Sequence, residues 1–309
     1  MKNYAKLIKL TLLVVSSTLM FSCSDDDSPQ QNNSITDIAS GNSNFSILVD
    51  ALTRADLAET LDQEGPYTVF APTNEAFMNF LDDNGFESLD DVPVATLTQV
   101  LLNHVVSGTN LSTGLTTGYV KTLAKGSASS TNTLSMFINT ASGVRLNGVS
   151  NVTTADIIAD NGVIHVVDAV IGLPTIVTHA TANPNFSTLA TLLTEQELVG
   201  TLNGTASSPF TVFAPLNSAF DTATLNLYSG LNSTQKTAVL TYHVVPGANI
   251  LSNAIPSGPI TTFETGTFTI SGTVITDEQS RATNIVATDV QASNGVIHAV
   301  NQVLLPNLD

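Results

Sequence analysis

The chain has 309 residues, of which 42% are hydrophobic and 11% are charged. At roughly 150 residues per domain, this length predicts two compact units, each able to form a core without disulfides or metals. The formal net charge of −17 argues against a nucleic-acid-binding protein, because a negative field repels phosphate backbones. Such acidity is typical of a soluble chain that repels its neighbours, and calcium bridging is the lesser alternative.

The first 22 residues have the pattern of an export signal. Lys2, Lys6 and Lys9 form a basic start, and a short, mostly apolar stretch from Leu10 to Phe21 follows. A membrane-crossing helix needs about 20 apolar residues, so this stretch is too short to span a bilayer comfortably. We therefore expect residues 1–22 to be removed as a signal peptide.

The only cysteine, Cys23, comes directly after this segment, in the sequence Leu-Met-Phe-Ser-Cys. This pattern resembles the lipobox of bacterial lipoproteins, in which the cysteine becomes the acylated N-terminus. Because two or more acyl chains give stable anchoring, we expect the protein to be held at a membrane through this lipid alone. A chance cysteine is the alternative.

Residues 23–34 are acidic and polar and predict a flexible tether, since they offer almost nothing to bury. The run from Asp25 to Asp27, next to Cys23, resembles the signal that sends lipoproteins of the Bacteroidota to the outer face of their outer membrane. The resemblance predicts a lipid-anchored protein on the cell surface. A plain linker on a protein facing the periplasm is the alternative.

The rest of the sequence is a duplication. Four segments recur in the same order in both halves of the chain. They are Asn44-Phe45-Ser46 with Asn185-Phe186-Ser187, Phe70–Phe77 with Phe213–Phe220, His104-Val105-Val106 with His243-Val244-Val245, and Asn161–His165 with Asn294–His298. We therefore expect one domain at residues 35–174 and a second at residues 175–309.

Each copy begins with a predicted amphipathic helix. Its apolar residues fall at positions i, i+3, i+4 and i+7 of a helical face. In the first copy these residues are Phe45, Leu48, Val49 and Leu52, and the second copy repeats the spacing from Phe186. Asn44 and Asn185 are the predicted N-caps.

A strand is predicted at residues 66–70, after which residues 71–74 break the strand and cap a second helix. A third helix carries an apolar stripe that ends at His104, so His104 and its counterpart His243 are expected to be partly exposed. The Thr-, Ser- and Val-rich middle of each copy predicts strands joined by tight turns. The apolar run at residues 163–171 predicts a buried strand, and mixed helices and mainly antiparallel strands give an α+β class.

The boxes at residues 68–77 and 161–168 resemble those of the fasciclin domain family, and the resemblance covers nearly all of residues 35–309, twice. It implies two tandem fasciclin-like domains, each a wedge-shaped β-sandwich with helices packed along one edge. It also implies a non-catalytic surface or extracellular protein that mediates cell adhesion or matrix attachment.

The resemblance also points to candidate binding residues. In animal members of the family a Tyr-His pair flanked by aliphatic residues is implicated in partner binding, and Tyr242-His243 looks like that pair. The first copy has Asn103-His104 at the matching place, which puts any function of the tyrosine there in doubt. Tyr242, His243 and His104 are thus the candidate partner-binding residues.

The remaining polar repeats favour structural roles. His165 and His298 lie in apolar runs and are expected to be hydrogen-bonded core residues, because no close ligand spacing supports a metal site. Asp156 and Asp289 invite a catalytic interpretation, but no Gly-x-Ser-x-Gly elbow and no second cysteine accompany them, so turn or cap roles are expected. No glycine pattern of a nucleotide site occurs. We expect no enzyme, no metal and no cofactor.

Together these features predict a surface-displayed, lipid-anchored adhesion protein with a monomeric ectodomain. Its partner would be a surface protein, a polysaccharide or a matrix polymer. The alternative is a glycan-binding accessory lipoprotein in nutrient capture, which would need exposed aromatic platforms. The chain has no tryptophan and only 6% aromatic residues, which argues against that alternative.

Overall fold

A computed structural model of the chain describes residues 33–62, 65–204 and 206–308. The predicted signal peptide, Cys23 and all but the last two residues of the predicted tether at 23–34 lie outside this part. Within the described ranges, no helix is both long and apolar enough to cross a membrane. The residues from Asn33 onward form one compact unit that contains both copies of the repeat.

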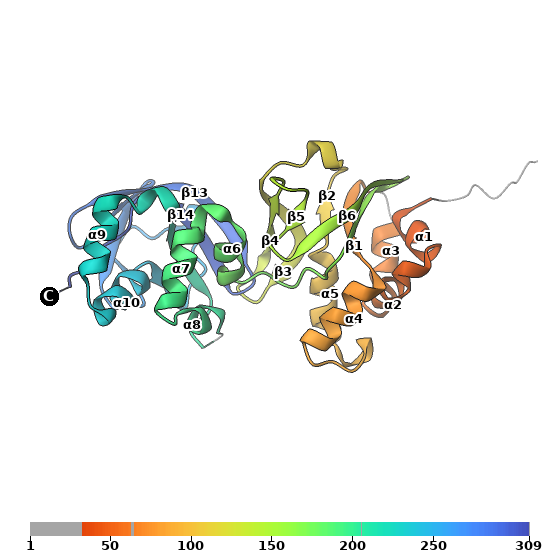
Figure 1. Cartoon of the computed structure of the whole chain (residues 1–309), viewed down its shortest axis with the longest axis horizontal. Helices are drawn as coiled ribbons and strands as arrows, with labels where there is room; N and C mark the ends of the chain where they lie inside the picture. Colours follow the sequence, from red (N-terminus) through yellow and green to blue (C-terminus); the bar gives the residue numbers. More distant parts are fainter. Residues whose placement is uncertain (1–32, 63–64, 205, 309) are drawn as a thin grey trace, which may run out of the picture. The chain divides into compact units, whose positions relative to one another are not determined.

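In the first copy, helices and strands alternate before a run of strands closes the domain (Figure 1). The helices are α1 (Ile35–Ser40), η1 (Ser43–Phe45), α2 (Ser46–Arg54), α3 (Ala58–Asp62), α4 (Asn74–Asp83), η2 (Leu89–Asp91), α5 (Val94–Leu102) and η3 (Ser112–Gly114). The strands are β1 (Tyr67–Pro72), β2 (Val105–Ser107), β3 (Gly118–Gly126), β4 (Ser129–Asn139), β5 (Arg145–Leu146), β6 (Ser150–Ala159) and β7 (Gly162–Val167). They form a closed barrel in the order β1-β2-β3-β4-β5-β6-β7, and α1 to α5 gather on one side of it (Figure 1).

The second copy repeats this plan. Its helices are α6 (Ile176–Ala182), η4 (Pro184–Phe186), α7 (Ser187–Glu195), α8 (Val199–Asn203), η5 (Asn217–Ala219), α9 (Thr222–Gly230), α10 (Ser233–Thr241) and η6 (Ser252–Ala254). Its strands are β8 (Phe210–Pro215), β9 (Val244–Val245), β10 (Ile260–Thr261), β11 (Thr267–Ser271), β12 (Val274–Thr276), β13 (Ala282–Ala292) and β14 (Gly295–Val300). The sheet order is β10-β11-β12-β13-β14-β8-β9, so the ladder is open between β10 and β9. Phe263 N still donates to Val244 O across that opening at 2.7 Å.

The predicted α+β class is confirmed, and the tandem organisation with it. The wedge expected for each copy is a barrel in the first copy and a nearly closed sheet in the second. Most strand pairs are antiparallel, as expected, but the first and last strands of each copy pair in parallel: β1 with β7 and β8 with β14.

These parallel strands are buried on both faces, which explains their continuous apolar character. Successive side chains of a strand point to opposite faces. Val69 of β1 therefore packs into the cluster between helices and barrel, whereas Phe70 packs into the barrel interior. Val212 and Phe213 of β8 divide in the same way between two clusters of the second copy.

The repeated Asn-Gly pair before the last strand holds three parts of the domain together. Asn161 Oδ1 accepts from Ile35 N at 3.0 Å, and Asn161 Nδ2 donates to Leu61 O at 2.7 Å. Asn294 makes the same two bonds, to Ile176 and Leu202. At Gly162 a Cβ atom would lie 2.0 Å from Tyr67 O, so only glycine fits this close approach of β7 to β1.

The helix starts differ from the prediction in one detail. The predicted caps Asn44 and Asn185 are wrong: Asn42 and Asn183 are the N-caps of the short helices η1 and η4, and their side chains accept from the backbone N of Asn44 and Asn185. The cap before α4 is as expected, since Thr73 Oγ1 accepts from Ala76 N at 3.2 Å.

Side chains of the two copies also contact each other. Lys121 Nζ donates to Asp289 O at 3.0 Å, and Ser135 Oγ accepts from Gln291 N at 3.0 Å. The ring of His179 on α6 is fully buried and lies edge-on to Tyr119, with ring centroids 5.4 Å apart.

Candidate functional site

His104 and His243 each bridge the end of a helix to the segment that leaves the last strand. His104 Nδ1 lies 2.7 Å from Val100 O, and Ile171 N donates to His104 Nε2 at 2.8 Å. His243 repeats both contacts, with Val239 O at 2.8 Å and Leu304 N at 2.8 Å. Because Nε2 accepts a hydrogen bond from a backbone amide, Nδ1 must carry the ring hydrogen and donate to the helix carbonyl.

This bridge requires a neutral imidazole. Burial lowers the pKa of both His104 and His243 from 6.5 to about 4, while the helix carbonyl that accepts from Nδ1 acts in the opposite direction. Their exposed fractions are only 2% each. The partial exposure expected for these two histidines is therefore wrong: the helix ends inside the domain, where the outgoing chain covers it.

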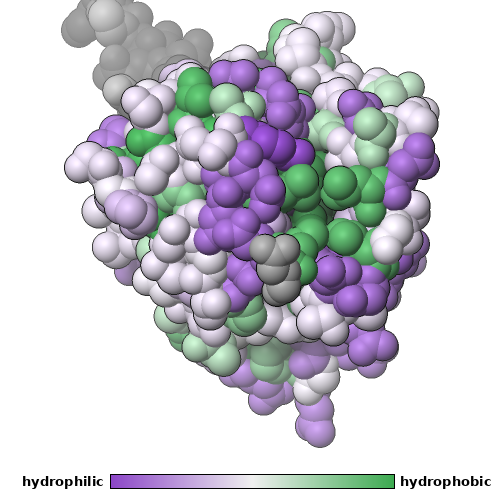
Figure 2. All heavy atoms as spheres, turned by 90° about the vertical axis from the view of Figure 1, so that its left-hand side faces the viewer, coloured by the Kyte–Doolittle hydropathy of each residue, from purple (hydrophilic) through white to green (hydrophobic). Residues whose placement is uncertain are grey.

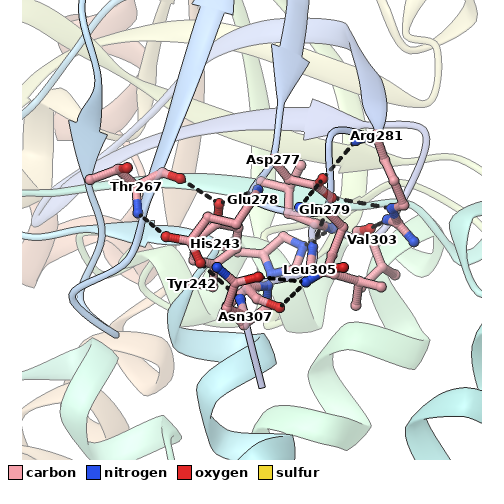
Figure 3. Close-up of polar contacts among 12 residues, drawn as sticks. Tyr242, His243, Thr267, Asp277, Glu278, Gln279, Arg281, Val303, Leu305 and Asn307 are labelled. Atoms are coloured by element: carbon pink, nitrogen blue, oxygen red, sulfur yellow. Dashed lines mark hydrogen bonds and ion pairs between the residues drawn. The ribbon is translucent and has the colours of Figure 1, made fainter. Parts of the chain in front are cut away.

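Tyr242 is fully buried beside His243 and belongs to a polar cluster shown in Figure 3. Its hydroxyl donates to Thr267 O at 2.7 Å and accepts from Glu278 N at 3.1 Å. Desolvation on burial raises the Tyr242 pKa. The hydroxyl thus ties α10 to the β11–β12 hairpin and to the loop that follows it.

The same loop holds the C-terminal segment (Figure 3). Asp277 Oδ2 accepts from Leu305 N at 3.0 Å, and Glu278 Oε2 accepts from Asn307 N at 2.8 Å. Arg281, which pairs with Asp277, donates to Val303 O. Residues 303–307 are therefore fastened along the loop by side chains.

In the first copy Asn103 takes the place of the tyrosine and makes different bonds. Asn103 Nδ2 donates to Gly172 O at 3.0 Å and to Ile171 O at 3.2 Å, and Asn103 Oδ1 accepts from Thr122 Oγ1 at 3.2 Å. Asn103 itself is fully buried. This position therefore has different roles in the two copies: Asn103 holds the chain that leaves the barrel, whereas Tyr242 holds the β11–β12 hairpin and the loop after it.

The three candidate partner-binding residues therefore lie in the interior, at the matching helix end of each copy, and do not form one surface. Tyr242, His243 and His104 are at most 2% exposed, so in this conformation none of them presents its side chain to a partner. Their role in partner binding stays a prediction, and it would have to act through the surface that they support.

A conservative substitution measures how much the Tyr242 hydroxyl contributes. We expect Tyr242→Phe to lower the free energy of unfolding of the second domain by about 1–3 kcal/mol, because the buried Glu278 N–H and Thr267 carbonyl lose their partner. Thermal unfolding of the full chain checks this, with Tyr67→Phe as the matched control, since no hydrogen bond of the Tyr67 hydroxyl is seen in the described structure. Equal midpoints for the two variants would contradict the structural role.

His165 and His298 are buried, hydrogen-bonded core residues, as predicted. His165 Nε2 lies 2.9 Å from Asn110 O, and Asp156 N donates to His165 Nδ1 at 3.2 Å. The second copy repeats the arrangement around His298, whose ring stacks on Phe213 with centroids 5.4 Å apart.

Asp156 and Asp289 have a structural role, as expected, but the turn predicted for them is wrong, because both lie inside strands. Both adopt left-handed backbone, with φ of 61° and 62°, at irregular points of β6 and β13. Asp156 accepts from Ser112 N at 2.8 Å and from Ser112 Oγ at 2.5 Å, which lowers its pKa.

Ser112 and its counterpart Ser252 were not predicted as functional residues, although Leu-Ser recurs at both places. Ser112, Asp156 and His165 are near one another, yet they cannot work as a catalytic triad. Ser112 Oγ bonds to the carboxylate rather than to the imidazole, and His165 Nε2 is committed to Asn110 O. No ring nitrogen is left to take the serine proton, which nucleophilic catalysis would need.

Across residues 33–62, 65–204 and 206–308, no group of three or more His, Cys, Asp and Glu side chains is placed to hold a metal ion. The polar residues common to both copies are instead bonded within the fold. A binding surface therefore has to be sought among exposed residues, and mainly among those that differ between the copies.

Several large apolar side chains of the described residues are exposed, and some of them lie on helices α4 and α9. Met78 on α4 is 55% exposed, and Leu225 and Leu227 on α9 are 42% and 46% exposed. Figure 2 views the end of the second domain and shows hydrophobic residues gathered among hydrophilic ones. Periodicity could have indicated these residues only as members of helices, since it does not say which apolar side chains stay uncovered.

The geometry defines a class of protein: two tandem α+β domains in which helices flank a barrel-like sheet and repeated polar side chains fasten its ends. The family model of the Fasciclin domain matches residues 43–174 and 184–306. The chain belongs to the fasciclin domain family.

Individual proteins are similar to this chain in sequence or in fold. Protein sll1483 of Synechocystis sp. is 39% identical over 138 residues, which cover 43% of this chain and 73% of that protein. Human periostin is 28% identical over 200 residues, 64% of this chain but 23% of periostin. A FAS1 domain pair from the insect cell adhesion molecule Fasciclin I superposes with a TM-score of 0.51 at 18% identity, over 87% of this chain and 98% of that one. This last similarity concerns the fold alone.

Proposed function

We propose that this chain is a lipid-anchored adhesion or matrix-interaction protein displayed on the cell surface, and that it has no catalytic role. The observation that carries the proposal is the duplicated fasciclin domain, in which each repeated histidine is committed to backbone hydrogen bonds. Such domains are rigid bodies that offer surfaces rather than reactive groups. The Fasciclin I pair, which comes from a cell adhesion molecule, is in keeping with the proposed adhesive role.

The expected membrane attachment follows from Cys23. Acylation of this cysteine would tether the two domains through the polar residues at 23–34, and the acidic run from Asp25 to Asp27 would direct the protein outward. Two domains on one tether raise avidity by about 10² to 10⁴ if both engage the same matrix. The partner is a surface protein, a polysaccharide or a matrix polymer.

The described surface gives little support to the glycan-binding alternative. All tyrosines and phenylalanines in the described part of the chain are buried or half-buried. Sugar-binding platforms depend on open aromatic faces, so protein contact is the better-supported mode.

Protease treatment of intact cells tests display directly. We expect protease to release the domain pair of the native protein by cutting the tether, and we expect a variant with Asp25 to Asp27 replaced by alanine to be protected. A Cys23→Ala variant should not be retained in the membrane fraction. Full protection of the native protein would place it in the periplasm and refute the cell-contact role.

A further inference from the structure

In the first domain, a surface hollow lies at the end of α4. Its volume is about 480 Å³, which falls in the size range of ligand sites. The lining residues are Met78, Leu81, Asp82, Gly85, Phe86 and Glu87. Gly85, with φ of 70°, turns the chain after the helix, and Phe86 N donates back to Leu81 O at 2.9 Å. The turn that shapes the hollow is therefore fixed by backbone geometry.

About half of the lining of this α4 hollow is apolar. Met78 is 55% exposed, and Leu81 and Phe86 are half-buried beside it. Methionine is flexible and polarisable, so its thioether adapts to apolar side chains of different shapes. An exposed apolar hollow with a polar rim is the usual form of a site for another protein.

The rim is negatively charged. Asp82, Asp83 and Glu87 are exposed, and among the described residues no Lys, Arg or His forms an ion pair with them. Residues 75–91 contain six acidic residues and no Lys or Arg. The rim therefore attracts cations and repels anionic lipid or polymer.

The second domain provides a comparison within the same chain. By the alignment of the repeat, residues 218–234 correspond to residues 75–91, and they contain one acidic residue, Asp221, instead of six. Helix α9, which lies in this segment, exposes Leu225 and Leu227. The repeated histidines are shared between the two copies, whereas the acidic residues of this rim belong to the first copy. The difference points to a binding property of the first domain.

We propose that the α4 hollow binds a protein segment in which an apolar side chain lies between Lys or Arg residues. The apolar side chain enters the hollow against Met78 and Phe86, and the flanking cations lie beside Asp82 and Glu87. The inference rests on the proposed adhesive function, because it specifies which side chains the adhesive partner would present. Its test uses the purified chain in solution, so its failure would leave surface display standing.

Methionine-methyl NMR of the full chain gives the test. Met78 reports on the hollow, and Met136, fully buried in the first barrel, is the internal reference. The probe is the peptide Gly-Lys-Lys-Leu-Lys-Lys-Gly. We expect it to shift the Met78 methyl resonance to saturation while Met136 stays fixed, and we expect a peptide with serine in place of leucine to bind at least about tenfold more weakly.

Variants test whether the peptide binds to the carboxylates of the rim or responds only to the overall negative charge of the chain. Asp82→Asn and Glu87→Gln should each weaken peptide binding about two- to fivefold, the effect of an exposed ion pair, and about 500 mM sodium chloride should weaken it further. The matched controls Asp50→Asn and Glu195→Gln should leave the affinity unchanged. The proposal is overturned if Met78 does not respond, if the serine peptide binds equally well, or if the controls weaken binding as much as the rim variants.

Discussion

Replacing His243 with alanine should lower the free energy of unfolding of the second domain by about 3–5 kcal/mol, and His104→Ala should do the same in the first domain. Two effects act together. Removing a buried ring leaves a cavity, and the outgoing amide and the helix carbonyl lose their partners inside the protein. In the second domain those orphaned groups are Leu304 N and Val239 O.

Hydrogen exchange followed by mass spectrometry measures this effect domain by domain, since amides of each copy fall in separate peptides. We expect a large loss of protection confined to the domain that carries the substitution. Asn79→Ala, at an exposed position of α4, is the control and should change little. Unchanged protection in His243→Ala would mean that the bridge does not hold the domain closed.

Because alanine substitution at these positions lowers the stability of the domain, it cannot by itself test whether they bind a partner. If Tyr242 and His243 are replaced together, weaker attachment would follow from an opened domain as readily as from a lost contact. Tyr242→Phe keeps the buried ring and removes only the hydroxyl, so it separates the two causes. Weaker attachment by a folded Tyr242→Phe variant would support the predicted partner-binding role.

Acidification should destabilise both domains between about pH 6.5 and pH 4, and the second domain more than the first. Burial lowers the pKa of His104, His179 and His243 to about 4, so each folded domain resists protonation that its unfolded chain accepts below 6.5. Their stabilising effect is complete above pH 6.5 and disappears as the pH falls to about 4. Each histidine accounts for roughly 3 kcal/mol over that interval.

The domains differ because their histidines differ in number. His104 is the histidine with a lowered pKa in the first copy, whereas His179, His243 and His298 all have a lowered pKa in the second. Around His243, Arg281 lowers the pKa further and Asp277 raises it. The carboxylates with a lowered pKa, Asp62, Asp156 and Asp221, release their stabilisation only below about pH 3.8.

Urea unfolding at pH 7.5, 5.5 and 4.5, read by hydrogen exchange in each copy, checks the acid prediction. We expect the second copy to lose protection first. His243→Gln, which keeps a donor and an acceptor but does not titrate, should flatten the dependence in the second copy only. Parallel losses in the two copies would show that the number of buried histidines does not control the acid response.

Much of the fold could be read from the sequence because it is local or duplicated. The helix from residue 46 and the cap at Thr73 follow from spacing or from turn chemistry a few residues long. The strand predicted at residues 66–70 is present, but the predicted break at residue 71 is wrong, because Ala71 and Pro72 continue the pairing of β1 with β7. The apolar residues on either side of His165 and His298 indicated their core role.

The burial of Tyr242 could not be read in this way. Its partners Thr267 and Glu278 lie 25 and 36 residues farther along the chain. The same tyrosine at a helix end would be exposed if the β11–β12 hairpin lay elsewhere. The N-caps were predicted two residues too late. The side chain of Asn42 accepts from the amide of Asn44, so Asn42 and not Asn44 is the cap.

The parallel pairing of β1 with β7 has a consequence for the order in which the protein forms. Synthesis from the N-terminus makes Tyr67 long before Val167, yet the barrel needs both ends to close. Contacts between distant segments are slow to form, and until then the early strands have unpaired edges. Each domain therefore stays open for as long as its last strand is missing.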